Sequence, residues 1–513
     1  MRVEQNRALV FRTNAPEAVT CVIPRSQLLP TGEVMVYWGY DETRVLNNMG
    51  YAVPSPIQRD YEYPGPFTPF KHQRETAGFL SLTHKGFCFD EMGCGKTAAG
   101  VWAADYLLRL GVIKRVLVVG PVSILQSVWE QEWFRLLPNR SCVVAYGSGP
   151  KRKEAFAGAA TIVVTNHDSV KHYRADIEAG GFDLIIVDEC NAFKTTTSDR
   201  WKALQSLVKP TTRLWLMTGT PASQSPLDAF GLGRLANPSN MPRSLHVWRD
   251  MVMHKLTQFK YVPKANARDQ VYAALQPAIR HHKKDCLDLP PVVYETRTVE
   301  MTPQQRKYYR VMEDKAVIDV GGATVTGINA AVKMLKLLQI SCGAVNTDCP
   351  EEFMEFDCSS RVKAVMELVE ESSNKIIIAV VYRNAMNVLL AALQAEYGVD
   401  AVTYINGSVS MGDRTERITA FQDNDNPRIM LIQPKAAAHG ITLTRADTTI
   451  WFSPTTSYDD FAQLNARMDR TGQVNNMTVV QLEGSPVEVQ LNAALRGRKE
   501  NSTALLEMLG RLT

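Results

Sequence analysis

The stretch from Asp90 to Thr97 reads DEMGCGKT and contains the residue types that hold the phosphates of a nucleotide. Gly93 and Gly95 let the backbone turn tightly, so that several N–H groups can point at phosphate oxygens, and the helix predicted after the loop adds its positive N-terminal end. Lys96 is expected to neutralise the β and γ phosphates, and the Thr97 hydroxyl to ligate Mg2+. Asp90 stands where the usual pattern has its first glycine, yet the loop follows an apolar run and precedes a helical pattern, as its chemistry requires. We predict that the phosphates of a nucleotide are bound here by Met92, Gly93, Cys94, Gly95, Lys96 and Thr97.

An acidic pair follows a second apolar run, Leu184–Val187, further along the chain. A carboxylate at the end of a buried strand beside a phosphate loop can hold Mg2+, which we predict for Asp188. The next carboxylate, Glu189, is expected to orient and deprotonate the attacking water. The segment Leu216–Pro221, reading LMTGTP, also lies at a strand end, and its small hydroxyl side chains are expected to sense the acidic pair and relay the state of the nucleotide.

Two series of apolar runs of strand length, alternating with helical segments, are expected to position these residues. Near-continuous apolar strands separated by helices predict a parallel sheet that is covered on both faces. The first series is Phe87–Phe89, Val116–Gly120, Ile162–Thr165, Leu184–Val187 and Leu214–Met217, and the second is Ile376–Val381, Val402–Ile405, Ile429–Ile432, Thr449–Phe452 and Thr478–Leu482. We therefore predict an α/β fold of two tandem lobes, separated by a segment of roughly residues 222–350 that is mainly helical by pattern.

The N-terminal residues follow a different pattern. Short β-type runs at Ala8–Phe11, Val19–Ile23 and Val34–Trp38 predict a small β-rich accessory domain, and the proline-rich stretch Tyr51–Pro69 predicts its extended linker. The predicted domains are residues 1–66 for the accessory domain and linker, 67–222 for the first lobe, 223–350 for a helical insertion, and 351–513 for the second lobe with a C-terminal helix.

Composition places the chain among packed globular proteins, because 45% of its residues are apolar and 21% are charged, which excludes a largely disordered protein. No apolar run approaches the roughly 18 residues that span a bilayer, and the N-terminus lacks the apolar core of a signal peptide. The nine cysteines show no C-x-x-C pair and no short spacing to histidine that would indicate zinc. We expect free thiols, no membrane partner, and a cytoplasmic location in a bacterium or phage-infected cell, or a nuclear one in a eukaryote.

The formal net charge of +4 is too small to indicate a polyanionic partner by itself, so only local clustering can do so. One stretch, Met241–Lys284, carries nine lysines and arginines against two aspartates. The nine are Arg243, Arg249, Lys255, Lys260, Lys264, Arg268, Arg280, Lys283 and Lys284. This cluster fits either a nucleic-acid surface or a solvated helix face, and composition leaves both interpretations open.

The motifs, in this order, resemble those of superfamily 2 helicases. The acidic box of that family usually reads D-E-A-D or D-E-x-H, whereas here Cys190 and Asn191 follow the acidic pair. In the family these two positions tune the coupling to the glycine-threonine motif, so the departure bears on coupling more than on hydrolysis, and Asn191 can still hydrogen-bond. By the same resemblance Gln73 reads the adenine base and Phe70 stacks on it.

The resemblance is closest to one branch, the Swi/Snf-type double-stranded DNA translocases. Their phosphate loop reads D-E-M-G-x-G-K-T, and their next motif has a strand, a proline and then W-x-x-E, matched by Val118–Pro121 and Trp129–Glu132. The middle segment Arg280–Pro291 is similar to the basic run before L-P-P in this branch, which general helicases lack. Met301–Tyr309 and Leu337–Cys342 continue the match.

The second lobe is similar to the later motifs of the same branch. The matching segments are Tyr404–Ser408, Ala436–Leu443 and Gln463–Gln473. A dissociative phosphoryl transfer needs cations at the γ-phosphate, and arginines from a second lobe supply them only when the lobes close. By resemblance Arg467 and Arg470 are these arginine fingers, expected on one helix face because they are three residues apart, with Gln463 nearby. Gly440 is expected at the nucleotide.

The resemblance covers about residues 67–485 and implies two tandem RecA-like lobes. It further implies an enzyme that uses ATP and Mg2+ to move along duplex or branched DNA, holds it mainly through the phosphate backbone, and remodels forks, branches or protein–DNA complexes. The compact size favours a minimal phage or bacterial form that acts as a monomer, with the N-terminal domain as the candidate site for a protein partner. Two alternatives stay open: a strand-separating DNA or RNA helicase, and an ATP-regulated DNA clamp with weak hydrolysis.

Overall fold

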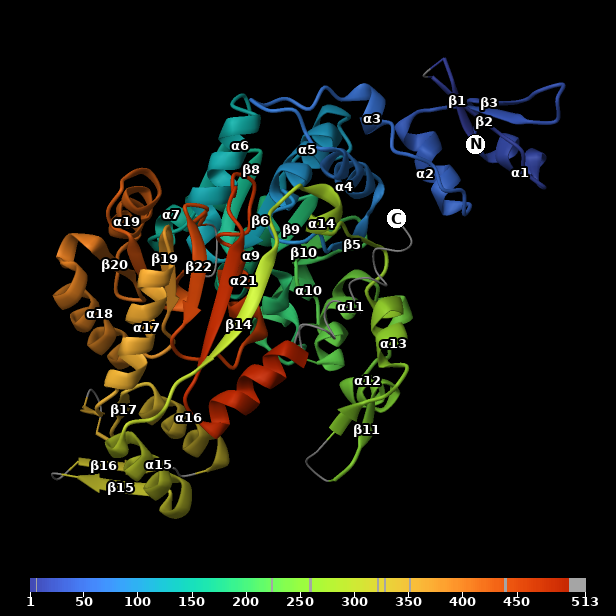
Figure 1. Ribbon diagram of the computed structural model, residues 1–513. Helices are drawn as coiled ribbons and strands as arrows, with labels where there is room; N and C mark the ends of the chain where they lie inside the picture. The colour runs from blue at the N-terminus through green and yellow to red at the C-terminus, as the bar shows by residue number, and fades with distance from the viewer. Residues whose placement is uncertain are drawn as a thin grey trace. The chain divides into compact units, whose positions relative to one another are not determined.

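The chain folds into two compact units (Figure 1). The computed structural model describes residues 1–5, 7–222, 225–257, 261–320, 323–326, 329–349, 352–437 and 441–497. The first unit comprises Met1–Cys286 and the second begins at Leu287. The border between them therefore falls inside the segment that the sequence predicts to be a helical insertion.

A parallel sheet forms the centre of the first unit. In spatial order its strands are β13 (Ala278–Ile279), β5 (Lys85–Cys88), β10 (Arg213–Met217), β9 (Leu184–Asp188), β6 (Val116–Gly120), β8 (Ile162–Asn166) and β7 (Cys142–Ala145). All of their pairings are parallel. The five strands predicted for the first lobe are confirmed to within a residue or two at their ends. Because β10 lies between β5 and β9, the segments that follow these three strands meet at one edge of the sheet.

Helices cover both faces of this sheet. They are α4 (Lys71–Leu82), α5 (Lys96–Arg109), α6 (Gln131–Leu136), α7 (Gly149–Ala157), α8 (Ser169–His172), α9 (Arg174–Gly180), α10 (Asp199–Leu207), α11 (Ala229–Ala236), α12 (Leu245–Val252) and α13 (Ala267–Ala274). In β9, Ile185 and Val187 pack in one core with α10 and α11, while Leu184 and Ile186 pack in the other with α4 and α5. This alternation is expected of a strand that is buried on both sides.

The N-terminal residues form a small antiparallel sheet with two helices. The sheet has the order β1 (Arg2–Glu4), β2 (Ala8–Phe11), β4 (Val34–Tyr37) and β3 (Ser26–Leu28), and the helices are α1 (Pro16–Val22) and α2 (Tyr40–Asn48). The prediction of a strand at Val19–Ile23 is wrong, because this run belongs to α1. Pro16 at the first position starts the helix, and Val19 and Ile23, four residues apart, share the face that enters the core.

The proline-rich stretch packs against the first unit instead of forming an open linker. It contains α3 (Ile57–Asp60), and the side chains of Tyr61 and Tyr63 are buried in the core that includes α5. The hydroxyl of Tyr61 donates to Oδ2 of the buried Asp105 at 2.8 Å. The prolines favour an extended chain, and the buried aromatic rings and this hydrogen bond hold that chain against α5.

A second parallel sheet forms the centre of the second unit. Its order is β14 (Val292–Thr298), β23 (Met477–Glu483), β22 (Ala446–Trp451), β19 (Lys375–Ala379), β21 (Ile429–Ile432) and β20 (Val402–Ile405), again with parallel pairings. The helices around it are α17 (Ser359–Glu371), α18 (Arg383–Tyr397), α19 (Met411–Asp423), α20 (Pro434–Ala437) and α21 (Tyr458–Asn465), and residues 486–497 are also helical. The five predicted strands are confirmed, and the two sheets establish the predicted α/β architecture of two lobes.

The middle segment is less helical than its pattern predicts. Besides α11–α13, α14 (Lys283–Cys286), α15 (Pro303–Lys315) and α16 (Ala330–Ser341), it contains the antiparallel pairs β11 (Met253–Lys255) with β12 (Tyr261–Pro263), β15 (Val317–Val320) with β16 (Ala323–Thr326), and β17 (Ala344–Asn346) with β18 (Phe353–Glu355). In addition, β13 joins the first sheet and β14 the second. These strands are short or, like β14, polar and exposed, so they lack the apolar run that reveals a strand. Among the described residues, no helix combines the length and the apolar character needed to span a membrane.

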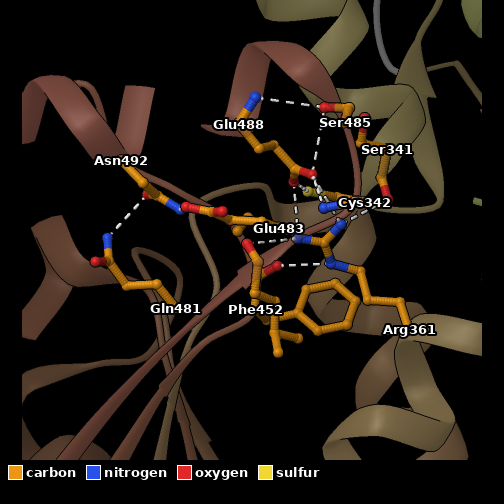
Figure 2. Close-up of polar contacts among 12 residues, drawn as sticks. Ser341, Cys342, Arg361, Phe452, Gln481, Glu483, Ser485, Glu488 and Asn492 are labelled. Atoms are coloured by element: carbon orange, nitrogen blue, oxygen red, sulfur yellow. Dashed lines mark hydrogen bonds and ion pairs between the residues drawn. The ribbon is translucent and has the colours of Figure 1, made fainter. Parts of the chain in front are cut away.

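A buried ion pair ties the helix of residues 486–497 to the second unit (Figure 2). The guanidinium of Arg361, in α17, donates to Oε1 of Glu488 at 2.7 Å, and both side chains are almost completely buried. Arg361 also donates to the carbonyls of Ser341 and Phe452, at 3.1 and 2.8 Å. One arginine therefore connects α16, α17, the end of β22 and the C-terminal helix.

Candidate active site

The phosphate loop occupies the turn between β5 and α5. Gly93 and Gly95 have φ values of 92° and 78°, a region that favours glycine because it has no Cβ. A Cβ on Gly95 would lie 2.1 Å from Nε2 of Gln73, so the loop also needs glycine here for space. The loop and Gln73 are thus packed directly on each other, as the predicted pairing of these residues at one nucleotide requires.

The ammonium of Lys96 lies on its own loop. Its Nζ donates to the carbonyl oxygens of Asp90 and Glu91, at 2.6 and 3.2 Å. Thr97 follows in the first turn of α5, and a Cβ on Gly219, in the segment after β10, would lie 3.1 Å from Cγ of Met92. The predicted loop residues and the LMTGTP segment are therefore neighbours in the fold.

A second group of predicted nucleotide contacts lies at the start of α4. The Oε1 of Gln73 accepts a hydrogen bond from the Phe70 N–H at 3.0 Å, which caps the helix. Its Nε2 donates to the carbonyl of Cys94 at 3.4 Å, and Nε2 of His72 donates to the same carbonyl at 2.8 Å. The ring of Phe70 is 45% exposed and stacks on His72 with 5.6 Å between the ring centroids. An aromatic face thus lies beside the loop, where a base can stack on it.

The acidic pair lies at the end of β9. The Oδ2 of Asp188 accepts a hydrogen bond from Nε1 of Trp129 at 2.9 Å, and Oδ1 accepts one from the N–H of Glu189 at 3.0 Å. Burial raises the pKa of Asp188, and the charge of Glu189 raises it further. Glu189 has φ 49° and ψ 54°, a left-handed conformation that is uncommon for non-glycine residues.

Trp129 is the site residue that the sequence reasoning missed. The W-x-x-E motif marked it only as a sign of resemblance, and nothing in its spacing indicates that its indole reaches Asp188, 59 residues away. Its side chain is fully buried in the core that includes α5, where a Cβ on Gly100 would lie 3.9 Å from its ring. Trp129 therefore fixes the orientation of the carboxylate that the sequence assigns to Mg2+.

A chain of hydrogen bonds connects the acidic pair with the LMTGTP segment. The Thr218 hydroxyl donates to Oε2 of Glu189 at 3.3 Å. The Asn191 amide donates to the Thr218 hydroxyl at 3.4 Å and to the carbonyl of Thr220 at 2.9 Å. The unusual Asn191 thus retains a direct contact with the glycine-threonine segment, while Cys190 is buried in the core.

The basic run before L-P-P contacts the start of the phosphate loop. Arg280, one of the nine cations considered for a nucleic-acid surface, has a fully buried side chain that donates to Oε1 of Glu91 at 2.9 Å. His281 contacts Asp90 through both its backbone N–H and Nδ1, at 2.8 and 2.9 Å. Burial raises the pKa of Asp90, but the hydrogen bond and charge of His281 outweigh it, so the pKa of Asp90 lies below its usual range.

The predicted arginine fingers form a separate group in the second unit. The expectation that they share a helix face is wrong, because α21 ends at Asn465 and the chain then turns. They still converge: Arg467 donates to the carbonyl of Ile441 at 3.4 Å, and Arg470 to the hydroxyl of Thr442 at 2.9 Å. Gln463, which is predicted to act near these arginines, is buried in α21, and Gly440 lies outside the described residues.

The chain matches two protein-family models. The model described as "SNF2-related domain" matches residues 35–347, and the "Helicase conserved C-terminal domain" matches residues 360–475. The first match begins upstream of residue 67, where the sequence resemblance starts, and so includes α2 and the packed proline-rich stretch.

Several curated proteins and solved structures are similar to this chain. "Putative protein p41" of Acyrthosiphon pisum secondary endosymbiont phage 1 is 24% identical, over 79% of this chain and 90% of its own length. "Protein CHROMATIN REMODELING 4" and "Probable ATP-dependent DNA helicase CHR23" of Arabidopsis thaliana are 24% and 25% identical over 80% of this chain, which spans only 20% and 40% of their lengths. The structure "Sulfolobus solfataricus SWI2/SNF2 ATPase core in complex with dsDNA" is 20% identical, with a TM-score of 0.43, over 88% of this chain and 96% of that one.

Proposed function

The chain belongs to the SNF2-related family of helicase-like enzymes, and from this we propose that it is an ATP-dependent translocase on double-stranded DNA. Its action is to remodel branched DNA, forks or protein–DNA complexes. The observation that supports the proposal is that the phosphate loop and acidic pair belong to the first unit and the arginine pair to the second, and we assign all of them to phosphoryl transfer. Such a division couples each hydrolysis cycle to a movement of the units.

The residues of the phosphate loop fit a bound nucleotide with Mg2+. The positive φ of Gly93 and Gly95 turns the loop so that N–H groups and the start of α5 face an anion. With nucleotide bound, Lys96 would exchange the carbonyls of Asp90 and Glu91 for the β and γ phosphates, and Thr97 would hold the metal. Phe70 stacks on the base, with Gln73 holding its edge. The nucleotide with its metal supplies the phosphoryl group that is transferred to water.

The acidic pair divides the chemistry between its two carboxylates. Asp188, oriented by Trp129, would hold Mg2+, and Glu189 would accept the proton of the attacking water. Thr218 responds to a shift of Glu189 through their hydrogen bond. Asn191 transmits this shift to the backbone of the LMTGTP segment through its hydrogen bond to Thr220.

The second unit carries the two arginines that the resemblance assigns to the reaction. Arg467 and Arg470 supply positive charge at the γ-phosphate in the transition state, where such a cation typically contributes a large rate factor. The two arginines donate hydrogen bonds to Ile441 and Thr442, which directly follow Gly440 in the sequence. Movement at the nucleotide is thereby passed to the DNA, which is held through its phosphates rather than through its base edges.

Steady-state ATP hydrolysis tests this proposal. The wild type, Glu189→Gln and the exposed-site control Glu178→Gln are measured without nucleic acid and with single-stranded DNA, linear duplex, a four-way junction and duplex RNA. We expect duplex or junction DNA to stimulate the wild type and the control, and Glu189→Gln to lose at least 100-fold of this rate, the order expected for a missing general base. Equal stimulation by single strands or RNA would favour the strand-separating helicase. ATP binding without stimulated hydrolysis would favour the clamp.

A further inference from the structure

A short crossover segment, residues 280–286, lies between β13 and the start of the second unit, and it extends the pairing of β13 with β5 into the phosphate loop. The N–H groups of Phe87 and Phe89 donate to the carbonyls of Pro277 and Ile279, at 2.9 and 2.8 Å. One step further along, the N–H of Glu91 donates to the carbonyl of His281 at 3.1 Å. The backbone of the crossover segment therefore follows the loop beyond the end of the strand.

Arg280 and Lys283, both in the crossover segment, donate hydrogen bonds to Phe89 and Glu91. Arg280 donates to the carbonyl of Phe89 at 2.6 Å and to Oε1 of Glu91 at 2.9 Å, and the N–H of Lys283 donates to Oε2 of Glu91 at 2.9 Å. Both carboxylate oxygens of Glu91 are thus bound by residues far away in the sequence. The Arg280 side chain is fully buried, so its charge would be costly without this partner, and the charge-assisted contact fixes its geometry.

Asp90 is held in the same way. Its Oδ1 accepts hydrogen bonds from the N–H and Nδ1 of His281, and its Oδ2 accepts one from the Thr76 hydroxyl at 2.6 Å. The Nε2 of His281 donates to Oε2 of Glu75 at 3.0 Å. The usual phosphate loop has glycine at the position of Asp90, which can make none of these side-chain contacts.

These contacts reach the lysine that binds phosphate. The carbonyl oxygens that hold Nζ of Lys96 belong to Asp90 and Glu91, the two residues that the crossover segment grips. The crossover segment therefore contacts both residues whose carbonyls accept hydrogen bonds from Lys96. It also ends at Cys286, immediately before the chain enters the second unit at Leu287.

We propose that Arg280 and His281 are positioning residues that set the affinity of the phosphate loop for nucleotide, and that the crossover segment transmits the state of the second unit to this loop. The proposal rests on the proposed function, because it assumes that ATP binds at Lys96. A displacement of the crossover segment shifts Asp90 and Glu91. Their carbonyl oxygens, which compete with phosphate for Lys96, shift with them. A movement of the second unit when the protein binds DNA thereby changes nucleotide affinity through the covalent connection of the units.

A double-mutant cycle on nucleotide affinity tests the positioning role. The full-length wild type, Arg280→Met, Glu91→Gln and the double variant are titrated with a fluorescent ATP analogue and Mg2+, without DNA, and Lys284→Ala serves as control because Lys284 is exposed in the same run. We expect each single variant to bind about tenfold more weakly, the double variant to lose much less than the product of the two, and the control to match the wild type. Losses that multiply, or folded variants with wild-type affinity, would overturn the positioning role.

The same cycle can be run on the second contact if Arg280→Met does not fold. His281→Gln, Asp90→Asn and their double variant then replace the first set, with the same expected result. Catalytic constants distinguish positioning from general damage: we expect KM for ATP to rise more than kcat falls. If the wild type binds no nucleotide, the proposed function fails as well, whereas binding that is equal in every folded variant overturns only the positioning role.

An insertion tests the transmission. Four flexible residues, Gly-Ser-Gly-Ser, placed between Leu287 and Asp288 lengthen the connection without altering any residue that touches the loop. We expect nucleotide affinity without DNA to stay within twofold of the wild type, and the change in affinity that duplex DNA causes in the wild type to disappear. A DNA effect that persists in the insertion variant, or a wild type without any DNA effect on affinity, would overturn the transmission.

Discussion

The indole of Trp129 donates a hydrogen bond to the carboxylate of Asp188, with 2.9 Å between Nε1 and Oδ2. The other carboxylate oxygen accepts the N–H of Glu189. Asp188 is therefore oriented from both sides before any metal binds, which is the arrangement expected of a ligand whose geometry is fixed by the groups around it.

Replacing Trp129 by phenylalanine removes this donor and keeps most of the buried ring. We expect Trp129→Phe to lower kcat for ATP hydrolysis about tenfold, the rate equivalent of one hydrogen bond of roughly 1.4 kcal/mol, and to raise the Mg2+ concentration needed for half-maximal rate. Trp133→Phe is the matched control, because Trp133 is equally buried and its indole N–H has no hydrogen-bond partner within the described ranges. A control that loses as much activity as Trp129→Phe would show that packing, not the hydrogen bond, is responsible.

Asn191 is predicted to couple DNA binding to hydrolysis. Asn191→Ala removes the hydrogen bonds to Thr218 and Thr220, so the acidic pair and the LMTGTP segment lose a direct connection. We expect the stimulation of ATP hydrolysis by duplex DNA to fall at least fivefold, roughly the effect of losing 1 kcal/mol of coupling, while the rate without DNA changes less. Cys190→Ala, next to it but directed into the core, is expected to keep its stimulation. Equal stimulation in both variants would refute the coupling role.

The ion pair of His281 predicts a pH dependence of stability. Burial alone would lower the pKa of His281, but its hydrogen bonds to Asp90 and Glu75 and the charges of these carboxylates raise it above the ordinary 6.5. The other groups that face the pair are the Thr76 hydroxyl and the ring of His72, and Lys71 pairs with Glu75. The protonated form is favoured in the folded state, so its contribution is complete below pH 6.5 and is lost as the pH rises through the raised pKa.

Thermal unfolding as a function of pH measures this contribution. We expect the difference in Tm between the wild type and His281→Gln to be largest at and below pH 6.5 and to shrink toward alkaline pH. Asp90, whose pKa is lowered, limits the effect on the acidic side, where the stabilisation is lost as the pH falls through its folded pKa. A Tm difference that grows with rising pH would contradict this account of the pair.

Glu488 is predicted to be a stability residue of the second unit. Glu488→Gln leaves the guanidinium of Arg361 buried without its charge partner, which costs about 3 kcal/mol or more in comparable cases (Figure 2). Glu371→Gln breaks an exposed contact with Arg297 and is expected to change stability much less, because solvent screens this pair. Hydrogen exchange of the peptides that cover β22 and β23 in the full chain gives the opening free energies to compare. Equal protection in the two variants would exclude a structural role for the buried pair.

The strands and the order of the motifs are predictable from sequence because both depend on local patterns. Apolar runs such as Val116–Gly120 and Ile429–Ile432 are buried on both faces and coincide with β6 and β21. The helix face expected for Arg467 and Arg470 was wrong for a tertiary reason: the carbonyl of Arg467 accepts the N–H of Leu443 at 2.9 Å, and the chain turns to make this bond.

Contacts between residues far apart in the sequence were not predictable. The charges of Arg280 and its neighbours fit a surface cluster, and only the fold shows that Arg280 is bound to Glu91, 189 positions away. β13 is two residues long, so no periodicity can reveal it, yet it aligns the crossover segment with the phosphate loop. The sequence therefore predicts which residues perform the chemistry, and the fold shows which neighbours hold those side chains.

Displacement of a third strand from duplex DNA tests the central proposal most directly. A labelled oligonucleotide bound as a triplex at one end of a linear duplex is released when a translocase runs into it, and the two strands of the duplex stay paired. We predict ATP-dependent release by the wild type, none by Glu189→Gln, and no unwinding of a tailed duplex under the same conditions. Unwinding of the tailed duplex without release of the third strand would contradict the account and identify the protein as a strand-separating helicase.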